Sequence, residues 1–102
     1  MSPAEGRFTV GLLAMDGAMP SCYTGVMDLL KIAQKLAQLR DPATKLRLES
    51  VLVGARGQAT ISLDGGLVIG PVHSPDRALD LLLVPGYMHA SVHDALERVR
   101  GY

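Results

Sequence analysis

The sequence predicts an α/β fold with a doubly wound, mostly parallel sheet. Residues 79–86 (LDLLLVPG) contain a run, 81–84, that is apolar at every position, as in a strand covered on both faces. Pro85 and Gly86 end this strand, and a helix is expected directly after them. Strand and helix patterns alternate in the preceding residues, which is the order typical of a parallel sheet.

The first strand and the first helix are expected in residues 8–40. Residues 8–14 form the strand after a flexible tail, 1–7, and residues 15–20 (MDGAMP) form a loop. Ser21 or Thr24 can cap the helix that follows. Its apolar residues recur at helical spacing, and Asp41-Pro42 ends it. These residues are Val26, Leu29, Leu30, Ala33, Leu36 and Ala37.

The remaining elements are a second strand, a hairpin and a last helix. The second strand covers residues 46–53 and ends at Gly54, and the turn Asp64-Gly65-Gly66 predicts a small hairpin of residues 58–63 and 67–69 at the sheet edge. Residues 71–77 form a loop that can hold one helical turn. The last helix begins at Ser91, with Asp94 completing a variant of the capping box, and carries an apolar stripe of Val92, Ala95, Leu96 and Val99.

The composition limits the class of protein. A chain of 102 residues, 48% of them hydrophobic, can bury one core, so residues 1–102 are expected to form a single domain. Ten basic and ten acidic residues cancel, which leaves no electrostatic site for DNA phosphates. Cys22 is the only cysteine, and neither a signal peptide nor a membrane-spanning run is present. We therefore expect a cytoplasmic protein that needs no metal, no cofactor and no membrane.

The predicted elements do not cover the predicted sheet. A strand as apolar as residues 79–84 needs neighbouring strands and helices on both faces, and the helices found here supply only part of that cover. We therefore expect a truncated domain, either as a fragment of a longer protein or as a chain that completes its sheet by association. An open apolar edge favours pairing with a second chain, so a homodimer is expected.

Three segments together resemble a known family. They are FTVGLLAMDGAMPSCYTGVMDLL, LRLESVLVGARGQATISLDGGLVIGP and LDLLLVPGYMH. The most specific features are Gly25 followed by Asp28, an extended pair around Gly65 or Gly66, and the motif D-x-L-x-V-P-G of residues 80–86. In this order they resemble the front half of the ThiJ/PfpI domain, a class I glutamine amidotransferase-like domain. The most similar branch is the one at the N-terminus of AraC-type transcriptional regulators.

The resemblance implies a flavodoxin-like fold and two alternative functions. The first is the non-catalytic sensory and dimerisation portion of a regulator, which binds a small metabolite. The second is a fragment of a cysteine-dependent enzyme, similar to isocyanide hydratase or an amidase. Enzymatic relatives carry an acid where this chain has Cys22, and the strand-to-helix elbow that bears their nucleophile lies beyond these residues, so the first is favoured. The regulators' helix-turn-helix domain would also lie downstream, so DNA contact is expected only through that domain.

The candidate ligand-binding residues gather around two turns. Because ligands of open α/β sheets bind beyond the carboxyl ends of the strands, we select the turn after residue 84 and the start of the first helix. The candidates are Cys22, Asp28, Pro85, Gly86, Tyr87 and His89.

Several of these candidates have a simpler structural explanation. Cys22 is read first as a buried apolar side chain, with a reactive thiol as the alternative. An acid such as Asp28 is favoured near a helix start in any case. His73 is expected to be solvated. His89 and His93 do not make a zinc site, because Ser91 as a cap places His89 outside the helix.

Overall fold

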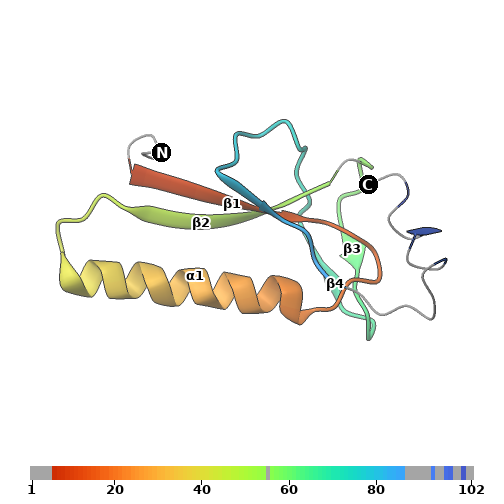
Figure 1. Ribbon diagram of the computed structural model, residues 1–102, viewed down its shortest axis with the longest axis horizontal. Helices are drawn as coiled ribbons and strands as arrows, with labels where there is room; N and C mark the ends of the chain where they lie inside the picture. Colours follow the sequence, from red (N-terminus) through yellow and green to blue (C-terminus); the bar gives the residue numbers. More distant parts are fainter. Residues whose placement is uncertain (1–5, 55, 87–92, 94–95, 98–99, 101–102) are drawn as a thin grey trace.

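The computed structural model describes residues 6–54, 56–86, 93, 96–97 and 100. Within them the chain is an α/β structure in which a helix, α1, packs on a three-stranded parallel sheet with the strand order β2-β1-β5 (Figure 1). The bounds are β1 Arg7–Leu13, α1 Ser21–Arg40, β2 Arg47–Val53 and β5 Leu81–Leu83. The predicted α/β class, the parallel strands and the helical crossover between β1 and β2 are confirmed. No helix among the described residues is both long enough and apolar enough to cross a membrane.

The first strand lies in the centre of the sheet and pairs with both of its neighbours. Its seven residues match those of β2 one by one, from Arg7 opposite Arg47 to Leu13 opposite Val53, while Val10 is aligned with Leu81 in β5. The predicted tail of residues 1–7 is therefore wrong at its last residue, because the backbone of Arg7 is already part of the sheet. A central strand explains why β1 is the most buried of the three.

The core lies between the sheet and the first half of α1. Tyr23 of α1 and Leu12 of β1 are each 1% exposed, and Leu52 of β2 joins the same cluster. Burial of these apolar groups is the main favourable term for holding α1 on the sheet. Further along α1, the side-chain amide of Gln34 donates to the Leu46 carbonyl at 2.9 Å and accepts from the Leu48 N–H at 2.6 Å.

The sequence predicted the end of α1 correctly but not the residue that caps its start. Asp41 is extended (φ −142°, ψ 93°), so the predicted stop before Pro42 is confirmed. The predicted cap at Ser21 or Thr24 is wrong, because Pro20 is already helical and occupies the capping position. Pro20 has no hydroxyl to offer, and the Thr24 hydroxyl instead donates back to the Pro20 carbonyl at 3.2 Å.

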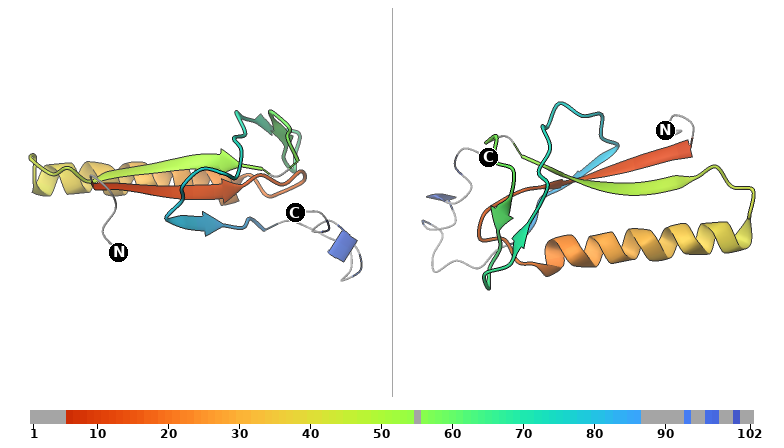
Figure 2. Two further views of the ribbon diagram at one scale, coloured as in Figure 1. Left: turned by 90° about the horizontal axis from the view of Figure 1, so that it is seen from above. Right: turned by 180° about the vertical axis from the view of Figure 1, so that it is seen from behind.

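The strand predicted to be covered on both faces is largely uncovered. Within the described residues, Leu81, Leu82 and Val84 are 46%, 48% and 66% exposed, so this prediction is wrong for them. The reason is that α1 runs along β1 and β2, which leaves β5 at the edge of the sheet (Figure 2). The helix predicted to begin at Ser91 lies mostly outside the described residues.

The predicted hairpin is present, but it does not extend the main sheet. β3 (Ile61–Ser62) and β4 (Val68–Ile69) pair antiparallel as a separate two-stranded sheet at one end of the molecule (Figure 1). Gly65 and Gly66 have φ angles of +87° and +88°, which confirms them as turn glycines. The edge of β2 is instead met by the following loop, since His73 forms a parallel bridge with Val53.

Candidate functional site

The start of α1 and the turn after β5 meet at the carboxyl edge of the sheet. The Met19 N–H donates to the Gly86 carbonyl at 2.9 Å. In return, the Gly86 N–H donates to Cys22 Sγ at 3.3 Å, and the same sulfur lies 4.0 Å from the Gly86 oxygen. Residues that are 64 positions apart in the sequence are thus joined side by side, at the edge where ligands of α/β sheets bind. We call this contact between residues 19–22 and 85–86 the junction.

The predicted candidates are only partly brought together. Cys22 and Gly86 are in contact, and Pro85 beside them is buried, so these three share one place. Asp28 is exposed and lies six residues further along α1, about 9 Å along the helix axis. It therefore does not belong to the junction. Tyr87 and His89 lie outside the described residues.

Cys22 is not the fully buried apolar residue that we expected first. It is half-buried, and its sulfur accepts a hydrogen bond from a backbone N–H. A Cβ placed on Gly86 would lie 3.8 Å from Cys22 Sγ, an ordinary van der Waals distance. The thiol therefore has a defined backbone partner and lies at the start of a helix.

Tyr23 positions the junction, and sequence reasoning missed it. Its hydroxyl donates to the Leu13 carbonyl at 2.8 Å and accepts from the Met15 N–H at 3.2 Å. The side chain of the first helical turn is thereby attached to the end of β1 and to the loop after it. The only signal in the sequence is that Tyr23, beside Cys22, is the one aromatic residue of α1, and a buried tyrosine normally finds a partner for its hydroxyl.

The loop between β1 and α1 is held from the other side by the hairpin. Asp16 accepts a hydrogen bond from the Ser62 N–H at 3.1 Å and another from the Gln58 side-chain amide at 3.0 Å. The Asp64 N–H donates to the Ala18 carbonyl at 2.9 Å. The hairpin therefore serves as a support for the junction rather than as an additional sheet strand.

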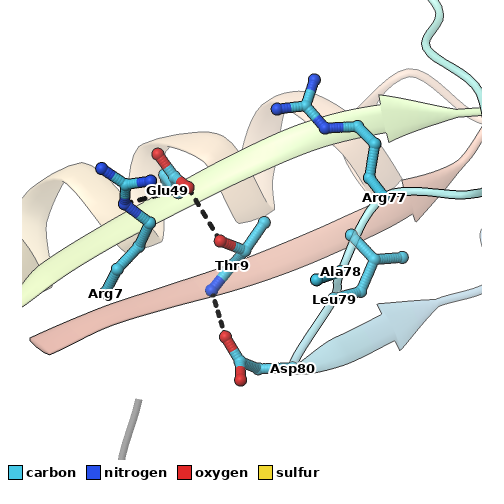
Figure 3. Close-up of a pocket in the computed structure, with 7 residues that line it drawn as sticks. All are labelled: Arg7, Thr9, Glu49, Arg77, Ala78, Leu79 and Asp80. Atoms are coloured by element: carbon cyan, nitrogen blue, oxygen red, sulfur yellow. Dashed lines mark hydrogen bonds and ion pairs between the residues drawn. The ribbon is translucent and has the colours of Figure 1, made fainter. Parts of the chain in front are cut away.

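A hollow lies at the opposite, amino end of the sheet (Figure 3). It has a volume of about 430 Å³ and contains acidic and basic side chains in equal number. The Thr9 N–H donates to Asp80 Oδ2 at 2.7 Å, and the Thr9 hydroxyl donates to Glu49 Oε1 at 2.8 Å. The lining residues are Arg7, Thr9, Glu49, Arg77, Ala78, Leu79 and Asp80.

The carboxylates of this hollow have a structural task. The Asp80 N–H donates to the Thr9 carbonyl at 2.9 Å, so Asp80 binds both backbone groups of Thr9 and aligns β5 with β1. Arg7 lies 3.7 Å from Glu49, an exposed ion pair that contributes little to stability. The first residue of the motif D-x-L-x-V-P-G is thus explained by strand alignment.

His73 lies in the loop that follows β4. His73 is exposed, as predicted, while its backbone N–H donates to the Leu52 carbonyl at 2.8 Å. Among the described residues, no group of three or more histidine, cysteine or acidic side chains is arranged to hold a metal ion.

Comparison of the chain with family models, curated proteins and solved structures gave no match. The resemblance to the ThiJ/PfpI domain therefore rests on the residues of this sequence alone.

Proposed function

We propose that this chain is the sensory and dimerisation portion of an AraC-type transcriptional regulator, built on a flavodoxin-like ThiJ/PfpI domain and without catalytic activity. The observation that carries the proposal is the amount of apolar surface on well-formed elements. Leu81, Leu82 and Val84 are about half to two-thirds exposed around β5, and a stripe on α1 is exposed to a similar extent. Apolar patches of this kind are typical of association surfaces.

The junction is the place where such a domain would bind a small metabolite. It lies at the carboxyl edge of a parallel sheet, and it joins the start of a helix to the turn after a strand. Cys22 stands where the enzymatic relatives of this family carry an acid, which supports binding without catalysis. A ligand that contacts Cys22 and Gly86 would touch both the start of α1 and the turn after β5. Its binding would therefore affect the exposed apolar surfaces of both elements.

DNA binding is assigned to the helix-turn-helix unit of such a regulator and not to these residues. The ten basic and ten acidic side chains balance, so they attract phosphates no more than they repel them. Transcriptional regulators of this family act in the cytoplasm, so we propose a cytoplasmic location for this chain.

The test is the mass of the chain in solution, measured by light scattering over a dilution series. We expect a dimer of about twice 10.8 kDa that dissociates as the concentration falls. Far-UV circular dichroism at each concentration shows whether the secondary structure is kept. A folded monomer at every concentration, up to the millimolar range, would contradict the proposed role in association.

A further inference from the structure

The outer side of α1 carries a second apolar stripe, separate from the one that packs on the sheet. We call it the outer stripe, and its members are Leu29, Ile32, Leu36 and Leu39, which are 63%, 58%, 54% and 72% exposed. Tyr23, Met27 and Leu30 face the core from the other side of the same helix. Figure 1 shows α1 lying along one side of the sheet, and the exposure of these four residues places the stripe on the side of the helix opposite the core-facing residues.

The spacing of the outer stripe is that of a helix that packs lengthwise against another helix. Its residues follow one another by three, four and three positions, which is the repeat of the apolar contact positions of paired helices. Gly25, four residues before Leu29, continues the same line, and a Cβ there would meet nothing within 4 Å. The stripe therefore runs along most of the helix. Because Gly25 has no side chain, it leaves a shallow place near the N-terminal end of the stripe.

The charges that flank the stripe decide the orientation of the partner. Asp28 and Lys35 are exposed, lie seven residues apart and border the stripe on one side. Within the described residues neither takes part in an ion pair. If a second copy of α1 runs antiparallel about a two-fold axis near the middle of this segment, Asp28 of each copy lies beside Lys35 of the other. Two opposite-charge pairs then close the contact symmetrically.

A parallel arrangement does not fit these charges. In parallel helix pairs, a residue at the position of Lys35 faces the residue five places further along in the partner, which here is Arg40. Two like-charge pairs would then flank the stripe. The antiparallel pair also sets Leu29 against Ile32 of the other copy, and Leu36 against Gly25, so that a large side chain meets the shallow place.

We propose that the outer stripe of α1 is a homodimer interface, in which the helices of two copies of this chain pack antiparallel with Asp28 of each copy beside Lys35 of the other. This inference rests on the proposed function, because it names the surface by which the chain associates. β5 is a weaker candidate, since it pairs over only three residues. One helix pair is a small interface, so we expect a dissociation constant on the order of micromolar.

Charge reversal tests the interface and its orientation together. We expect Asp28→Lys or Lys35→Asp alone to weaken dimerisation about tenfold, measured by sedimentation equilibrium or light scattering. An equimolar mixture of the two variants restores two opposite-charge pairs and is expected to form heterodimers as tight as the unaltered dimer. Lys31→Asp is the matched control, because it makes the same charge change on α1 away from the stripe. Circular dichroism confirms that each variant is folded.

The outcomes separate this inference from the proposed function. A dimer that neither reversal weakens would overturn the helix interface while leaving association, through another surface, intact. A dimer that Lys35→Asp tightens would show parallel helices and would also overturn the proposal. If the unaltered chain is a folded monomer throughout, the role in association fails as well. Weakening by each reversal with recovery in the mixture would establish the antiparallel pair.

Discussion

Removal of a single hydroxyl, by Tyr23→Phe, is expected to loosen the start of α1. The Tyr23 ring is 1% exposed and remains buried in the variant, so its apolar contribution is kept. The substitution removes a donor to the Leu13 carbonyl at 2.8 Å and an acceptor for the Met15 N–H at 3.2 Å. The effect therefore isolates two hydrogen bonds from the packing of the ring.

The expected loss is about 2 kcal/mol in the free energy of unfolding. Each hydrogen bond contributes about 1 kcal/mol, and the bond from the Met15 N–H is buried, so its loss leaves an unpaired donor inside the protein. For a chain of this size, such a loss lowers the melting temperature by about 10 °C. Urea unfolding followed by far-UV circular dichroism measures it, with an unchanged dependence on urea concentration showing that the folded state is otherwise kept.

The matched control for this variant is Thr24→Val, one residue further along α1. The Thr24 hydroxyl also bonds to a backbone carbonyl, that of Pro20 at 3.2 Å, but it is exposed, so water can replace it. We expect a loss of less than about 0.5 kcal/mol. If Tyr23→Phe costs no more than Thr24→Val, the tyrosine hydroxyl does not hold the helix start and our account of the junction is wrong.

Three further changes test other parts of the fold by the same unfolding measurement. Gln34→Ala removes one hydrogen bond to Leu48 of β2 and one to Leu46 just before it, and should cost about 1–2 kcal/mol, whereas Gln38→Ala, exposed on the same helix, should be nearly neutral; equal effects would contradict the link. Gly65→Ala places a side chain at φ +87° and should cost about 1 kcal/mol, while Gly25→Ala should stabilise by about 0.5–1 kcal/mol; the reverse order would refute both assignments. Asp80→Ala removes the acceptor of a β1 N–H and should cost about 1–2 kcal/mol, and no loss would show that β5 is aligned by other contacts.

The local elements could be predicted because their signals are local. Asp41-Pro42 stops α1 by steric restriction within two residues, and Gly65-Gly66 turns the chain by a conformation that glycine alone adopts freely. The start of α1 was predicted wrongly because the residue before Ser21 also fits the start of a helix. Pro20 takes the capping position and Ser21 is the first residue of the helix, so the hydroxyl that suggested a cap is not at the capping position.

The long-range contacts could not be predicted from the sequence pattern. The Thr9 hydroxyl bonds to Glu49, and the Thr9 N–H to Asp80, 71 residues away, and no periodicity links these positions. The exposure of Leu82 shows the same limit. An apolar run indicates that burial would stabilise a strand. Whether the strand is buried depends on where α1 and the loops pack, which the run itself does not determine. Of the junction, the sequence analysis selected Cys22 and Gly86, which are in contact, but not Tyr23, which holds the helix start.

The central position of β1 sets the order in which the chain can be assembled during synthesis. Among the described strands, β1 leaves the ribosome before β2 and β5, and the contact between Thr9 and Asp80 waits until 71 residues after Thr9 have been made. At a synthesis rate of about 5–20 residues per second, that wait is about 4–14 s. Through this time one edge of β1 has no strand beside it, although β1, α1 and β2 can already pack together. The edge of β1 is thus open to wrong pairing until β5 arrives, and the pairing of β5 with β1 closes that edge.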